Sequence, residues 1–62
     1  SFKGIVNADG LNIRSGPGVH NKSIGSYNTG DQVEITEISY IVDVPWGKTD
    51  KGWICLHYVN EI

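Results

Sequence analysis

Two side chains near the end of the chain, Cys55 and His57, are of the types needed for a thiol nucleophile and its general base. Their spacing of two residues would place both on one face of a strand. A catalytic thiol also needs a third group that orients the base and an arrangement that stabilises an oxyanion, and the sequence indicates neither. We therefore interpret Cys55 as a packed or half-exposed free thiol, and we expect no catalytic residue in this chain.

The histidines and glycines could belong to two other kinds of site. One Cys and two His are fewer than the four ligands of a closed zinc site, and His20 lies far from His57 along the chain, in a loop. Gly16-Pro17-Gly18 has the glycines of a phosphate-binding loop but lacks the Lys-Ser/Thr pair and the helix that follow in such loops. We predict no metal or cofactor site and interpret the glycine segment as a structural loop.

Length and composition limit what can position these side chains. With 62 residues and a mass of 6.8 kDa, the chain forms at most one small domain with a thin core. A core of this size leaves no room for a dinucleotide cofactor or a deep catalytic cleft. The formal net charge is −2 and the basic residues are scattered, so no patch for nucleic acid and no basic helix for a membrane surface is predicted. A single cysteine excludes an intramolecular disulfide.

The apolar residues favour an all-β domain. Val and Ile supply 14 of the 24 apolar residues, and branching at Cβ suits a pleated sheet better than a helix. Alternation of apolar and polar residues predicts that six of them face the core: Leu11, Ile13, Ile24, Val33, Ile35 and Ile54. Five or six short strands with tight turns in a chain of this length suggest a small closed or nearly closed barrel.

The turn signals divide the chain into short segments. Asp9-Gly10 predicts a tight turn, and Asp50-Lys51 with Gly52 predicts a hairpin between the two tryptophan segments. Residues 32–44 give the longest strand signal, which Pro45 ends. The alternation in this segment changes parity at Thr36-Glu37, which predicts a β-bulge there, or else a loop from Ile38 onward. The other predicted elements are strands at 11–14 and 22–27 and, over 57–62, one helical turn with a closing strand.

Three motifs resemble those of bacterial SH3-like domains, often called SH3b. The first is L-N-I-R-S-G-P over residues 11–17, and the second is I-G-S-Y-N-T-G-D-Q-V-E-I over residues 24–35. The third combines W-G-K at residues 46–48 with G-W-I-C-L-H-Y-V at residues 52–59. The resemblance covers the chain from about Gly4 to Val59. It implies an SH3-like barrel of five to seven short strands with one short 3₁₀ turn near the C-terminus.

The resemblance also implies a function. Domains of this family are appended to cell-wall hydrolases, phage endolysins and surface proteins, where they are thought to bind peptidoglycan, commonly its peptide portion. We therefore expect residues 1–62 to be a non-catalytic, wall-binding domain taken from a longer secreted protein of a Gram-positive bacterium or its phage. The expected location is extracellular, at the cell wall. Tandem copies or a catalytic domain of the same chain are the other expected partners.

The aromatic residues indicate where such a ligand would bind. The chain has six of them, too many for so thin a core, and Tyr and Trp suit peptide and sugar surfaces. Trp46 and Tyr58 resemble the Trp and Tyr that line the peptide groove of eukaryotic SH3 domains, although Cys55 replaces the groove proline. We expect a shallow ligand face with Trp46 and Tyr58, to which Arg14, Tyr40 and His57 add polar contacts.

Three alternatives remain open from the sequence. Trp46 and Tyr58 could instead pack beneath the loops. Arg14 could pair with a carboxylate, or pack its stem on an aromatic ring, without touching a ligand. The whole domain could act as a spacer that packs against its own parent catalytic domain.

Overall fold

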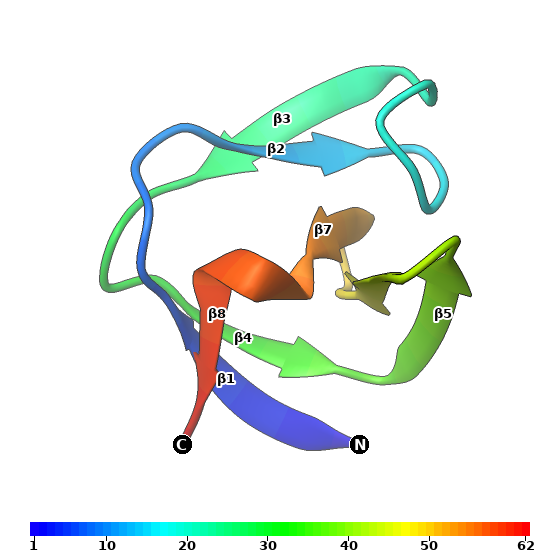
Figure 1. Cartoon of the computed structure of the whole chain (residues 1–62). Helices are drawn as coiled ribbons and strands as arrows, with labels where there is room; N and C mark the ends of the chain where they lie inside the picture. Colours follow the sequence, from blue (N-terminus) through cyan, green and yellow to red (C-terminus); the bar gives the residue numbers. More distant parts are fainter.

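The computed structural model describes residues 1–62 and is all-β, as predicted. Eight strands form two antiparallel sheets, with the order β4-β1-β8 in the smaller and β3-β2-β7-β6-β5 in the larger (Figure 1). The strands are β1 (Phe2–Val6), β2 (Leu11–Arg14), β3 (Ser23–Tyr27), β4 (Gln32–Ile35), β5 (Glu37–Ile41), β6 (Val44–Lys48), β7 (Trp53–Cys55) and β8 (Val59–Glu61). A single 3₁₀ turn, η1 (Leu56–Tyr58), precedes β8. No helix has the length and apolar character that crossing a membrane requires.

Residues 32–44, which the sequence predicted as one long strand, contain two strands that belong to different sheets. β4 pairs with β1 in the smaller sheet, and β5 pairs with β6 in the larger one. The chain crosses between the sheets at Thr36, whose backbone N–H donates to Lys48 O at 3.0 Å. The parity change in the sequence marks this crossing, so the predicted bulge and the alternative loop from Ile38 are both wrong. The split brings the strand count to eight, above the five to seven expected.

Pro45 does not end a strand, contrary to expectation, but lies within β6. A two-residue turn at Val42 and Asp43 reverses the chain, and Pro45 then pairs with Tyr40 of β5. The ladder with β7 on the other side of β6 begins only at Trp46. Pro45 therefore lies where β6 has a partner on one side alone, which is a position that proline tolerates.

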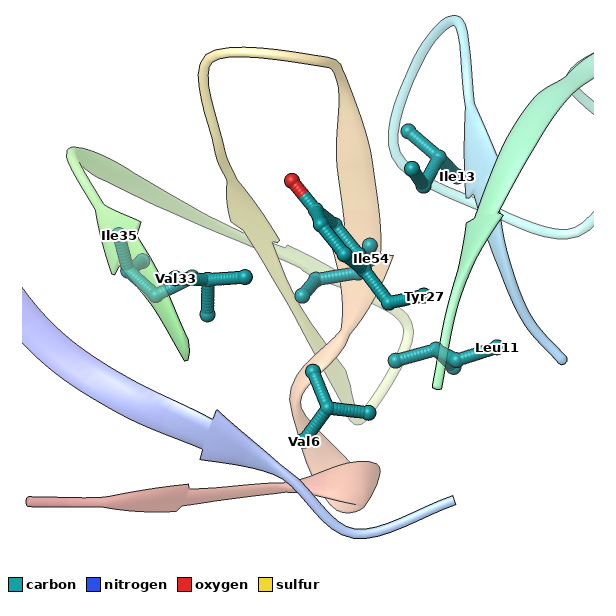
Figure 2. Close-up of a cluster of buried hydrophobic side chains, with 7 residues drawn as sticks. All are labelled: Val6, Leu11, Ile13, Tyr27, Val33, Ile35 and Ile54. Carbon is teal, nitrogen blue, oxygen red and sulfur yellow. The ribbon is translucent and has the colours of Figure 1, made fainter. Parts of the chain in front are cut away.

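The hydrophobic core lies between the two sheets. It consists of Val6, Leu11, Ile13, Tyr27, Val33, Ile35 and Ile54, and Figure 2 shows Ile54 at its centre. Five of the six predicted core residues are confirmed. Ile24 is the exception, because 54% of it is exposed. The register of β2 and β3 shifts next to it, so Ile13 pairs with Gly25 and Arg14 with Ser23, and β3 is an edge strand that buries only Tyr27.

A buried polar contact fixes the hairpin of β6 and β7 to the core. The Tyr27 hydroxyl donates to Thr49 Oγ1 at 3.1 Å, and Thr49 is 3% exposed. Thr49 and Gly52 exchange backbone hydrogen bonds of 2.7 and 3.3 Å across the turn. Each buried polar group thus has a partner, which removes the cost of placing hydroxyls in a core. The hairpin that the sequence predicted around Asp50-Lys51 is confirmed.

Two turns are joined at the end of the molecule where β1 leads into β2. Asp9 Oδ1 accepts a hydrogen bond from Thr29 N at 3.0 Å, and Gly10 N donates to Asn28 Oδ1 at 3.0 Å. The positive φ of Gly10, 66°, confirms the predicted tight turn. The backbone N–H of Thr29 is the main cause that holds the pKa of Asp9 below its ordinary value of 3.8. Because this carboxylate is exposed, solvent screens its contribution to stability.

We expect the charge on Asp9 to stabilise the fold at neutral pH but not in acid. A carboxylate with a lowered folded-state pKa adds stability above its unfolded value of 3.8 and loses it as the pH falls toward the folded-state value. Urea unfolding should therefore find Asp9→Asn less stable than the wild type near pH 7, with the gap closing near pH 2. Glu34→Gln, an exposed carboxylate on β4, is the control for a general charge effect. A gap that does not change with pH would contradict the prediction.

Candidate functional site

One groove, with a volume of about 470 Å³, lies where two loops of the larger sheet come together. Its walls are the loop between β2 and β3, which supplies Gly18, Val19 and His20, and the turn between β5 and β6 with its flanking residues. In Figure 1 this loop, in cyan, and the end of β5, in yellow-green, lie on the same side of the molecule. Trp46 of β6, Cys55 of β7 and the turn η1 complete the lining. We call this hollow the groove.

Four of the five predicted site residues line the groove: Arg14, Trp46, His57 and Tyr58. Tyr40 does not. It is 69% exposed, and its neighbour Ile41 lines the groove. Successive side chains of a strand point to opposite faces, so Tyr40 lies on the far face of β5. The groove therefore does not include Tyr40.

Trp46 lines the groove although it is almost completely buried. It is 4% exposed and pairs with Ser39 on one side and Cys55 on the other. Most of the Trp46 side chain is therefore packed inside the protein, in agreement with the alternative that it lies beneath the loops. Tyr58 is 48% exposed and offers the larger aromatic surface to a ligand.

Arg14 is held in place by the loop that it supports. Its Nη1 donates to Asn21 O at 3.0 Å, and Asn21 Nδ2 donates to Pro17 O at 2.7 Å. A Cβ at Gly16 would lie 3.1 Å from the Asn21 side chain, so glycine leaves the space that Asn21 fills. These contacts agree with the structural interpretation of the glycine segment. Arg14 bonds a loop carbonyl rather than the carboxylate that the sequence suggested as its partner.

His20 is a groove residue that the sequence did not predict. It follows the glycine segment, and a Cβ at Gly18 would lie 2.9 Å from its ring carbon Cε1. The ring therefore packs against a glycine whose φ of 113° suits few other residues. The loop folds back over the sheet through the bonds of Asn21, and nothing in the spacing of His20 and His57 shows that they share one groove.

Cys55 and His57 both line the groove, but not in the way the spacing implied. Cys55 ends β7, and His57 lies in η1, so the two do not share the face of one strand. No group of three or more His, Cys, Asp or Glu side chains is arranged to hold a metal ion. What the groove offers is an apolar surface with a few hydrogen-bonding groups, an arrangement suited to binding.

A second, smaller hollow adjoins the groove. It has a volume of about 330 Å³ and shares Leu11, Asn12 and Tyr58 with the groove, continuing past them to Asp9 and Gly10. Tyr58 thus stands between two hollows on one surface. An extended ligand that crosses Tyr58 would contact both.

Comparisons of this chain with protein-family models, with curated proteins and with solved structures find no match. The first and third sequence motifs supply residues of the groove, whereas the second, residues 24–35, supplies none.

Proposed function

We propose that this chain is an SH3-like domain of the SH3b type that binds the peptide portion of peptidoglycan in the groove. It would act without catalysis, holding a secreted lytic enzyme or surface protein of a Gram-positive bacterium or phage at the cell wall. The two packed sheets and the 3₁₀ turn before the last strand are compatible with the small barrel of that family.

One observation carries this proposal: motifs that lie far apart in the sequence meet at the groove. The first motif supplies Arg14, the W-G-K segment supplies Trp46, and the final motif supplies Tyr58. A binding site assembled from several segments is what a shared ligand surface requires, whereas purely structural motifs need meet only in the core. The paired hollows on either side of Tyr58 suit an extended chain such as a wall peptide.

A second candidate is favoured by a different surface. Ile38 and Tyr40 are 47% and 69% exposed and lie on the face of β5 that points away from the groove. β5 is also an edge strand of the larger sheet. A parent catalytic domain could cover this face, in which case the chain would be a spacer packed against its own enzyme.

Two tyrosines separate the two candidates. We expect Tyr58→Ala to weaken binding to purified Gram-positive sacculi by about tenfold or more, because the few contact residues that dominate an interface are enriched in Tyr and cost about 2 kcal/mol or more when truncated. Tyr40→Ala, an equally drastic change at an exposed tyrosine outside the groove, should bind within about twofold of the wild type. The measurement is a sedimentation assay with two joined copies of the domain. Joining the copies makes the second binding event intramolecular, so weak binding by each copy becomes measurable.

Trp46→Ala is unsuitable for this test, because the residue is 4% exposed and truncating so large a buried side chain would destabilise the fold. No binding by the joined wild-type copies would contradict the wall-binding proposal. An equal loss of affinity in Tyr58→Ala and Tyr40→Ala would show that the groove is not the ligand surface.

A further inference from the structure

The groove is lined by basic side chains and by no carboxylate. Arg14 from β2, His20 from the β2–β3 loop and His57 from η1 line it, with Cys55 and Tyr58 as the other titratable groups. β5 and β6 add none. No Asp or Glu lines the groove, although the chain carries seven of them and has a formal net charge of −2. The groove thus has basic side chains without a carboxylate beside them, on a protein whose net charge is negative.

Arg14 is held by a hydrogen bond to the loop, whereas His20 is exposed. One N–H of the Arg14 guanidinium is taken by Asn21 O, which leaves four of its five donors for another acceptor. The His20 ring packs against Gly18. A planar guanidinium held in this way matches a carboxylate, which can accept two parallel hydrogen bonds from it.

The rest of the rim is apolar. Val19 is 72% exposed and Val42 89% exposed, and they belong to the two loops that form opposite walls. Val42 has a φ of 57°, which β-branched residues rarely adopt. Backbone conformations of this kind concentrate at binding sites, where the surrounding structure maintains them. Val19 and Val42 thus offer apolar contacts to the part of a ligand that lies next to the group bound by Arg14.

We propose that the groove binds the free carboxylate at the end of a peptide, together with the apolar side chain beside that carboxylate. Arg14, His20 and His57 receive the carboxylate, and Val19 and Val42 receive the side chain. That the peptide belongs to the cell wall rests on the function proposed above. The carboxylate itself is inferred from the groove alone, through its charge complementarity with a lining that has three basic side chains and no acid.

The test compares two probes that differ only in the terminal group: N-acetyl-alanyl-alanine as the free acid and as the carboxamide. We expect the acid to bind about tenfold more tightly near pH 6, since hydrogen bonds to charged groups are the stronger ones. Cys55 is the single cysteine, is half-buried and lines the groove, so protection from alkylation at one fixed pH reports occupancy. Chemical shifts of the amides at 18–20 and 57 in NMR spectra measure the affinity independently.

In Arg14→Gln the preference for the acid over the amide should fall to about twofold or less, and in His20→Gln/His57→Gln it should fall as well. Lys22→Gln removes a positive charge from the same loop at an exposed residue that does not line the groove, and it should keep the preference of the wild type. Retained native amide spectra establish that each variant is folded.

The outcomes separate this proposal from the function on which it rests. Equal affinity for acid and amide overturns carboxylate recognition, whether or not sacculi bind. An equal loss of preference in Lys22→Gln overturns it too, because general charge attraction would then explain the effect. Preference for the acid without binding to sacculi supports carboxylate recognition and overturns the cell wall as its source.

Discussion

Replacing Ile54 with alanine is expected to leave most of the protein unfolded at 25 °C. Ile54 is 0% exposed and stands at the centre of the core in Figure 2, between residues of both sheets. Truncation of a buried isoleucine to alanine costs about 2–5 kcal/mol. A single core in a domain of this size rarely supplies more than about 3–5 kcal/mol of net stability. The loss is therefore comparable with the whole stability of the fold, and circular dichroism with urea titration measures it.

The same substitution at an exposed isoleucine provides the control. Ile62 is 61% exposed at the end of the chain, so Ile62→Ala should change the free energy of unfolding by no more than about 0.5 kcal/mol. A cooperative, reversible transition of Ile54→Ala close to that of Ile62→Ala would show that the core is not where the stability lies.

Gly52→Ala is expected to destabilise the fold by a similar amount, about 2–6 kcal/mol. Gly52 has a φ of 146°, which strains a residue with a side chain. A Cβ there would also lie 2.8 Å from Arg14 O and 2.8 Å from Ile13 Cγ2. Because Arg14 O is backbone, it cannot move aside without shifting β2. The variant should lose stability and, where still folded, disturb the groove through Arg14.

Gly30→Ala separates the two causes. Gly30 also has a positive φ, 94°, but a Cβ there would meet nothing within 4 Å. It should therefore show only the cost of the backbone conformation, about 1–3 kcal/mol. Thermal unfolding of both variants measures the difference, which we assign to the collision at Gly52. Equal losses of stability would mean that β2 shifts at little cost and that the close approach of Gly52 to β2 is not needed for stability.

Local patterns predicted the β-strand content and most of the core. Leu11 and Ile13, like Val33 and Ile35, are alternate residues on short strands, and each pair faces one core whatever the topology. Ile24 follows the same pattern but lies at a register shift on an edge strand, and register depends on the partner strand. The prediction of one long strand over residues 32–44 was wrong for a related reason. A parity change indicates that the inward face alters, but a bulge and a crossing between sheets alter it alike.

The groove was predictable in part. Three residues of the sequence motifs, Arg14, Trp46 and Tyr58, do meet there. Tyr40 lies outside the groove, because the number of aromatic residues indicates that some are exposed but not which face of a strand each one occupies. His20 was missed because its position follows from how the β2–β3 loop folds back, which is set by the hydrogen bonds of Asn21. Such bonds depend on tertiary geometry that no periodicity encodes.

The position of β1 has a consequence for how the protein is made. β1 lies between β4 and β8 in the smaller sheet, and Ile62 N donates to Lys3 O at 2.9 Å. On the ribosome, β1 therefore keeps one unpaired edge until β8 emerges. Pairing between distant segments is slow, and an open strand edge accepts any matching strand. In a chain carrying several copies of this domain, β8 of one copy would compete for β1 of the next, so domain swapping during translation is the characteristic misfolding route of this topology.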